Sequence, residues 1–216
     1  MRTVGVGFLM ALVAAVSTQP AFAGAARSRI DAVVRDAVAH RGVKAAIVQV
    51  TVAGRPVITK AYGQSLTGVP ATTRMHFRNG AVATAYMSTL LLRLADRGRV
   101  DLADKLSKWL PRLPGARRVT LGMLAAMTAG YPDYASDPRL TQLRYSNPFR
   151  VITNRQKLRL ALDRPLQFRP GTNSSYSHSD YVILGLALER ITGRPLDVAL
   201  RRMVLPSPSL SAVRLP

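Results

Sequence analysis

The stretch that decides the fold runs from Phe77 to Leu106 and reads FRNGAVATAYMSTLLLRLADRGRVDLADKL. Within it, residues 81–95 place apolar side chains on nearly every face of a helix, and Gly98 follows shortly as a stop signal. A helix that is apolar all round is normally buried in the centre of a domain. The sequence therefore predicts a central buried helix here, with the other elements packed around it.

The segment before this helix predicts a β-hairpin. Residues 45–52 read AAIVQVTV, a short β-branched and apolar run, and residues 57–62 form a second extended run. The AGRP sequence at 53–56 between them is a turn signal. Ahead of the hairpin, the capping-box-like Ser28–Asp31 predicts the start of a helix that Gly42 ends.

Helices dominate the chain after the central one. Three polar residues are predicted to cap them at their N-termini: Thr120, Asn154 and Ser179. The predicted helices cover residues 121–127, 155–162, 180–192 and 195–205. The Pro, Ser and Tyr of residues 131–149 predict an irregular loop. One hairpin followed by several helices indicates the α+β class.

Composition narrows the classes of function. The chain has 216 residues, a formal net charge of +20 and no cysteine, which excludes disulfide scaffolds and cysteine-ligated metal sites. Its histidines, His40, His76 and His178, are scattered, so we expect no metal site and no cofactor. Six per cent aromatic residues give little surface for base stacking, so no nucleic-acid partner is expected. The basic excess is either a compositional bias or a source of attraction to anionic polymers and lipid headgroups.

Residues 1–23 have the pattern of a secretory signal peptide. Arg2 provides the positively charged n-region, and residues 4–16 form an apolar stretch that is shorter than a typical membrane-spanning helix. Ala21–Ala23 matches an A-x-A cleavage site. An uncleaved anchor or a buried helix is the alternative. The pattern predicts an exported mature chain of residues 24–216, located in the periplasm, on the cell wall or outside the cell.

Several motifs of this chain, taken in order, match one known pattern. Residues 77–84 read FRNGAVAT, which corresponds to F-R-x-G-S-x-T-K, and residues 97–111 correspond to G-x-L-x-L-D-D-x-V and W-L-P. Residues 119–134 and 170–193 correspond to segments with H-T-S-G-L-P-D-Y and P-G-x-x-x-x-Y-S-N. The chain thereby resembles the beta-lactamase-related serine hydrolases, which include class C beta-lactamases, D-alanyl-D-alanine carboxypeptidases and esterases. The resemblance implies a beta-lactamase/DD-peptidase-like α+β fold, with the hairpin part of an antiparallel sheet beside a mainly helical domain.

Residues 24–216 correspond to only part of that domain. The late K-T-G or H-x-G motif of the family has no counterpart after residue 193, and the strands that accompany it are missing from the match. We therefore expect an incomplete sheet with an unpaired strand edge. Such an edge predicts a homo-oligomer, or a second chain that completes the sheet.

The positions that carry the family's nucleophilic chemistry are altered. Its S-x-x-K pair works because residues three apart share a helix face, so that the lysine can take the serine proton. The corresponding residues here are Ala81 and Thr84, which supply neither a hydroxyl nucleophile nor an amine base. No S-x-x-K or T-x-x-K occurs anywhere in the sequence, which predicts catalytic degeneracy.

The second motif of the family is partly kept. Tyr176 matches its tyrosine, which the resemblance implies moves protons, and His178 stands where the family has a substrate-orienting asparagine. The resemblance implies substrate binding at His178 and at Gly171 of the P-G turn. We expect Ala81 near the start of the buried helix, with Tyr176 and His178 across a cleft from it.

Three functions stay open at this point. The first is a non-catalytic or vestigial protein that contacts cell-wall peptide or glycan. The second is an enzyme of this hydrolase family that weakly hydrolyses an ester or amide through Tyr176, His178 and a water molecule. The third is a basic module that binds anionic wall polymer or a membrane surface.

Overall fold

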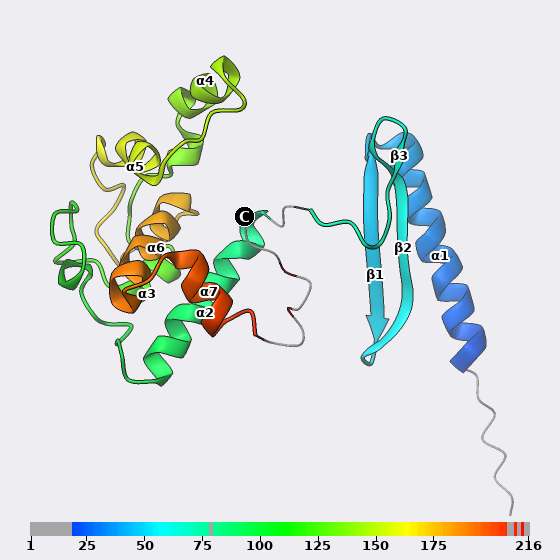
Figure 1. The fold of residues 1–216 in the computed structure, drawn as a ribbon, viewed down its shortest axis with the longest axis horizontal. Helices are drawn as coiled ribbons and strands as arrows, with labels where there is room; N and C mark the ends of the chain where they lie inside the picture. Colours follow the sequence, from blue (N-terminus) through cyan, green and yellow to red (C-terminus); the bar gives the residue numbers. More distant parts are fainter. Residues whose placement is uncertain (1–18, 78–79, 207–209, 211–212, 214–216) are drawn as a thin grey trace, which may run out of the picture. The chain divides into compact units, whose positions relative to one another are not determined.

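The computed structural model of the protein describes residues 19–77, 80–206, 210 and 213, and the chain divides into two compact units. The first unit, within residues 1–78, holds a helix and a small sheet, and the second, residues 79–216, is helical (Figure 1). Most of the predicted signal segment, residues 1–18, lies outside the described residues. No helix in the described part of the chain is long and apolar enough to cross a membrane.

The first helix, α1, spans Gln19–His40 and therefore begins well before Ser28. The predicted capping role of Ser28 is wrong, because the residue lies inside the helix and its hydroxyl donates to the carbonyl of Gly24 at 3.2 Å. A serine hydroxyl within a helix commonly bonds the carbonyl one turn earlier in this way. The end of the helix agrees with the prediction, since Gly42 follows it with a φ of 71°.

One carboxylate holds α1 to the sheet. Asp31 accepts hydrogen bonds from the ammonium of Lys60 at 2.5 Å and from the hydroxyl of Tyr62 at 2.9 Å, both on the second strand. Together with the hydrogen bond from Arg35, which has the largest effect, these contacts hold the pKa of Asp31 far below its usual range. The helix and the hairpin therefore form one packed unit.

The sheet contains the predicted hairpin and one further strand. Strands β1 (Ala45–Val52) and β2 (Arg55–Leu66) pair antiparallel, and Ala53 and Gly54 between them both have positive φ, as in a type I′ turn. The short β3 (Val69–Pro70), which was not predicted, pairs with the end of β2 in the order β1-β2-β3. Among the described residues no strand pairs with the outer edge of β1, and its pairing with another chain stays a prediction.

The predicted central helix is confirmed as α2 (Ala83–Asp96), which follows the short 3-10 turn η1 (Gly80–Val82). Three leucines of this helix are buried in the core: Leu90, Leu91 and Leu94. The helix packs against α6 (His178–Thr192) and α7 (Leu196–Met203), as Figure 1 shows. The core of the second unit therefore forms around α2 and α6.

Two further helices begin at side-chain caps. Thr120 caps α3 (Leu121–Ala125), as predicted, by accepting a hydrogen bond from a backbone N–H of its first turn. Helix α5 (Asn154–Leu162) is capped by Thr153 and not by Asn154. The reason is a capping box, in which Thr153 and Gln156 each bond the backbone N–H of the other.

The cap of α6 also differs from the prediction by two residues. Ser177 accepts the hydrogen bond from the backbone N–H of Asp180, so Ser177 is the N-cap and Ser179 lies within the first turn. Gly193 ends the helix in the left-handed conformation, as predicted. Pro195 precedes α7, which fits the fixed φ of proline at a helix start.

The prediction of an irregular loop over residues 131–149 is partly wrong. This segment contains the 3-10 turn η3 (Tyr134–Ser136) and the helix α4 (Pro138–Ser146). Asp137 caps α4, and the following proline occupies a position that prolines favour in the first helical turn. A proline that suggests a loop in the sequence therefore starts a helix here. A further short turn, η2, covers Leu106–Lys108.

Candidate functional site

The start of α2 holds the two positions matched to a nucleophile and a base. Ala81 lies in the η1 turn and is exposed, so it precedes the buried part of the helix. The hydroxyl of Thr84 donates a hydrogen bond to the carbonyl of Ala81 at 2.7 Å. The alanine side chain has no oxygen to attack a carbonyl group, and the threonine hydroxyl is hydrogen-bonded to the backbone of the same turn. This helix start therefore lacks the groups for serine acylation.

The start of α6 brings three polar or aromatic side chains together. The Nδ1 atom of His178 lies 3.0 Å from the carboxylate of Asp133, and the backbone N–H of His178 donates to the same carboxylate at 3.1 Å. The rings of Tyr176 and His178 meet edge to face with centroids 5.0 Å apart. Tyr176 is 54% exposed, so part of the residue is accessible to a ligand. A carboxylate that holds one imidazole nitrogen leaves the other, Nε2, for a bound molecule.

Asp133 is the residue of this site that the sequence analysis did not single out. It lies in the sequence GYPDY at 130–134, inside a segment that already matched the family pattern. The feature that could have pointed to this residue is its carboxylate, which stands between a proline and a tyrosine in that matched segment. Only the fold shows that this carboxylate reaches a histidine 45 positions later in the chain.

A buried polar network fixes the position of Asp133 relative to α6. The hydroxyl of Ser179, which is fully buried, donates to the carbonyl of Pro132 at 2.7 Å and accepts from the backbone N–H of Tyr134 at 3.0 Å. The hydroxyl of Ser177 lies 3.3 Å from the carbonyl of Tyr131. The residues on both sides of Asp133 are thus fastened to the helix that carries His178.

A buried carboxyl group lies under the same helix start. Asp180 is fully buried, and its Oδ1 atom accepts a hydrogen bond from the hydroxyl of Ser177 at 3.0 Å. Burial raises the pKa of Asp180 to about 7, although the hydrogen bond from Ser177 acts in the opposite direction. Among the described residues, no hydrogen-bond partner is found for its Oδ2 atom. Because Asp180 is buried and bonded to Ser177, we assign it a structural role and not a contact with a ligand.

The two helix starts belong to one packed pair of helices. The hydroxyls of Ser88 on α2 and Tyr181 on α6 lie 2.8 Å apart, and Tyr181 in turn donates to the carbonyl of Ala125 at 2.9 Å. Ser88 lies one turn after Thr84, on the same face of its helix, and Tyr181 lies one turn after His178. The fold therefore brings the two matched motifs into the same half of the helical unit. The predicted cleft between them stays a prediction.

The backbone conformation at position 171 explains why this residue is a glycine. Its φ is 82°, and its N–H donates to the carbonyl of Thr128 at 2.9 Å. This left-handed conformation favours glycine. A Cβ atom at this position would also lie 3.0 Å from the end of the Met123 side chain. The substrate contact that the resemblance implies for Gly171 stays a prediction.

No cluster of three or more His, Cys, Asp or Glu side chains that could hold a metal ion is found among the described residues. At the site itself, Asp133 and His178 form a pair and no third ligand joins them. These two side chains and Tyr176 can provide acid–base and hydrogen-bond chemistry.

Comparison with known proteins identifies the family. A family model described as Beta-lactamase matches residues 30–209 of this chain. The chain belongs to the beta-lactamase family. The match covers residues of both units and confirms the resemblance that the motifs indicate.

One curated relative is a protein of Salmonella typhimurium named "Putative D-alanyl-D-alanine carboxypeptidase". It is 26% identical over 138 residues, which cover 60% of this chain and 31% of that protein. The chain thus spans about a third of the length of the curated relatives it matches.

Solved structures show the same fold. A D-stereospecific amidohydrolase from Streptomyces sp. is 25% identical with a TM-score of 0.71, over 85% of this chain and 53% of that chain. A D-amino acid amidase from Ochrobactrum anthropi SV3 is 25% identical with a TM-score of 0.69, over 83% of this chain and 48% of that chain. A penicillin-binding protein homologue from Pyrococcus abyssi has a TM-score of 0.71 at 19% identity, which shows the fold alone. These likenesses confirm the predicted beta-lactamase/DD-peptidase-like α+β fold class.

Proposed function

We propose that this member of the beta-lactamase family forms no acyl-enzyme and binds a peptide or glycan of the cell wall without cleaving it. The observation that carries the proposal is the start of α2. Ala81 occupies the position of the nucleophile, and Thr84, at the position of the base, bonds the Ala81 carbonyl at 2.7 Å. Loss of the nucleophile costs on the order of 10⁶ in turnover in a serine hydrolase where it has been measured. Binding does not depend on those two groups.

The relatives favour a ligand with D-amino acids. Their names refer to D-alanyl-D-alanine, to D-amino acid amides and to D-stereospecific hydrolysis. In this chain Tyr176 is accessible, and Asp133 holds His178 so that one ring nitrogen is free to contact a ligand. A phenol and an imidazole in this arrangement provide hydrogen bonds to the amide or carboxylate groups of such a peptide.

The test is calorimetric titration of the protein with a short peptide that ends in D-Ala-D-Ala. We expect reversible binding and recovery of the intact peptide by chromatography. The variant His178→Ala should weaken binding about tenfold, since a hydrogen bond to a buried ligand contributes roughly 1 kcal/mol or more. The variant His76→Ala is the control, because His76 is exposed and belongs to the other unit. Release of D-alanine above the buffer rate, or no binding at millimolar peptide, would overturn the proposal.

A second candidate function is slow hydrolysis by water, and the contact between Asp133 and His178 favours it. In this reaction His178 takes a proton from water, and the resulting hydroxide attacks the carbonyl carbon of an ester. The tetrahedral intermediate then expels an alkoxide, which takes the proton from the His178 imidazolium, either directly or through the hydroxyl of Tyr176, so that both side chains return to their starting state. Asp133 keeps the imidazole ring of His178 oriented.

This candidate is tested with an activated ester such as p-nitrophenyl acetate. It requires a rate above the buffer rate that falls at least tenfold in His178→Gln and less in Asp133→Asn. Equal rates for the parent protein, His178→Gln and His76→Gln would eliminate it.

Export of the chain is part of the proposal, because the predicted ligand lies outside the cytoplasm. The pattern of residues 1–23 supports it, with cleavage after Ala23. N-terminal sequencing of the protein recovered from the cells that produce it should begin at Gly24. A cytoplasmic protein that still begins at Met1 would contradict export.

A further inference from the structure

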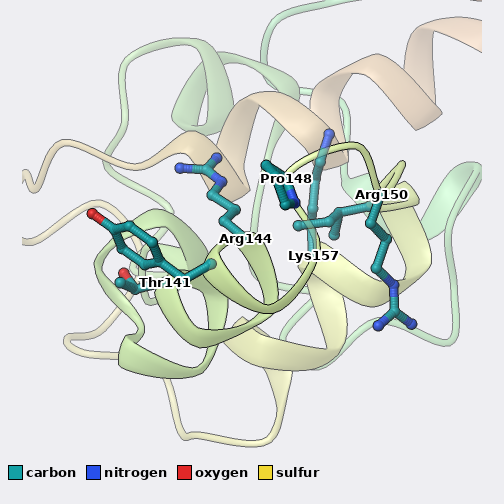
Figure 2. Close-up of a pocket in the computed structure, with 7 residues that line it drawn as sticks. Thr141, Arg144, Pro148, Arg150 and Lys157 are labelled. Carbon is teal, nitrogen blue, oxygen red and sulfur yellow. The ribbon is translucent and has the colours of Figure 1, made fainter.

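We propose that a basic cavity on the α4–α5 side of the helical unit binds a ligand that carries a phosphate group. The cavity has a volume of about 620 Å³, and its lining includes Arg144, Arg150 and Lys157 but no acidic side chain (Figure 2). Nothing in this proposal depends on the peptide-binding function proposed above. It assigns a ligand class to one defined part of a strongly basic protein.

Two of the three cations share one side of the cavity. Figure 2 shows the ends of Arg144 and Lys157 projecting to the same side of the connection between the helices, whereas the guanidinium of Arg150 turns the other way. Arg144 lies in the last turn of α4, and Lys157 lies in α5. Burial lowers the pKa of Lys157, and the charge of Arg144 lowers it further. The fold therefore holds two like charges near one another in a partly desolvated place.

The carboxylates that flank α4 and α5, Asp137 before α4 and Asp163 after α5, pair with other arginines. Asp137 pairs with Arg139 at 2.8 Å and with Arg164 at 3.6 Å, and Asp163 pairs with Arg139 at 2.6 Å. In the part of the chain that the structure describes, neither Arg144 nor Lys157 makes an ion pair. The ammonium of Lys157 instead lies 6.0 Å from the ring centroid of Tyr134. The pair lacks a counter-charge, and an anionic ligand would supply it.

The two positive charges of Arg144 and Lys157 favour a doubly charged phosphate ester over a singly charged carboxylate. A guanidinium binds phosphate oxygens in a forked geometry, and an ammonium adds a point charge, so together they match a doubly charged group. Thr141 adds a hydroxyl, and the lining also includes the aromatic side chain of Tyr145, which is 85% exposed. The volume exceeds that of one phosphate group and leaves room for the polyol or sugar to which it is attached.

The position of the cavity connects it with the candidate site. Tyr134 is near a residue of each: the centroid of its ring lies 6.0 Å from the Lys157 ammonium and 6.0 Å from the centroid of the His178 ring. A phosphate held by Arg144 and Lys157 would therefore anchor a ligand close to Asp133 and His178.

The experiment measures binding of three probes to the purified protein: inorganic phosphate, glycerol 3-phosphate and a poly(glycerol phosphate) polymer. Arg144→Gln and Lys157→Gln should each weaken binding tenfold or more. Arg155→Gln is the matched control, because it removes the same charge from an exposed residue of α5 outside the cavity lining and should change binding less than twofold. Binding of glycerol 3-phosphate assigns a small ester as the ligand, whereas binding of the polymer alone assigns a repeated phosphodiester.

Two results would overturn the inference. Equal weakening in all three variants would show that the phosphate responds to the overall charge and not to this cavity. Absence of binding by every probe at low salt would show that the cavity takes no phosphate. Thermal unfolding of each variant ensures that a loss of binding is not a loss of folding, and Lys157→Gln should not lower the melting temperature, since it relieves repulsion from Arg144.

Discussion

The starts of α2 and α6 carry the two motifs that match the family, and they are built in opposite ways. At α6, Ser177, Ser179 and Asp180 are buried, and their side chains bond one another and the chain at residues 131–134. At α2, Ala81 is exposed and its carbonyl accepts a local hydrogen bond from the hydroxyl of Thr84. One start is part of the folded core, and the other is part of the surface.

The difference teaches which part of a catalytic motif the fold itself requires. The polar side chains at α6 cannot be removed without leaving buried groups unpaired, which is costly. A serine and a lysine at Ala81 and Thr84 would be needed for chemistry, but the helix forms without them. The start of α2 thus tolerates an alanine and a threonine at the two matched positions, while the polar contacts at the start of α6 are kept.

The largest expected effect concerns the buried carboxyl of Asp180. A raised pKa means that the folded state holds a proton that the unfolded state releases, so stability falls as the pH rises from about 4 to about 7 and is level above that. Each unit of pKa difference corresponds to about 1.4 kcal/mol, so the fall amounts to several kcal/mol. Asp180→Asn should remove this part of the pH dependence, as measured by urea unfolding between pH 4.5 and 8. Parallel curves for the two proteins would mean that Asp180 does not hold a proton in the folded state.

The next largest effect is the loss of stability expected when Ser179, a structural residue of the α6 start, is replaced. Ser179→Ala leaves the carbonyl of Pro132 and the N–H of Tyr134 without their partner, at a cost of about 1–3 kcal/mol for each group. Urea unfolding at one pH measures the loss. Ser146→Ala is the control, because that hydroxyl bonds its own helix at an exposed site and should cost less than about 0.5 kcal/mol. Equal losses in the two variants would contradict the role given to the α6 network.

The smallest expected effect is on the α2 side. Ala81→Ser should change the free energy of unfolding by less than about 0.5 kcal/mol, because the residue is exposed. It should also leave hydrolysis of a chromogenic beta-lactam at the parent level, since Thr84 offers no amine to take the serine proton. A large gain in turnover from this single change would mean that another base serves the site.

Most of the fold could be predicted because its signals are local. The apolar residues of α2, the turn at Ala53 and Gly54 and the stop at Gly193 each depend on a few neighbouring residues. The two-residue strand β3 is too short to leave such a pattern. The predicted start of α1 was wrong, because the hydroxyl of Ser28 donates a hydrogen bond to a carbonyl inside the helix and does not cap the helix.

The site was only partly predictable, because its contacts join distant parts of the chain. Tyr176 and His178 came from a motif, but Asp133 reaches His178 only through the folded loop at residues 131–134. The choice of Ser177 over Ser179 as the cap has the same origin, since Ser179 is taken by that loop. Likewise, Arg144 and Lys157 come near one another because α4 packs beside α5. A local sequence pattern cannot predict that packing.

The central claim is that the protein forms no acyl-enzyme, because the position of the nucleophile at the start of α2 holds Ala81. Intact-protein mass spectrometry after incubation with excess penicillin tests this claim most directly. The account predicts an unchanged mass, because Ala81 has no oxygen to open the beta-lactam ring. An added mass of one penicillin per chain, mapped by peptide analysis to any residue of the helical unit, would contradict it.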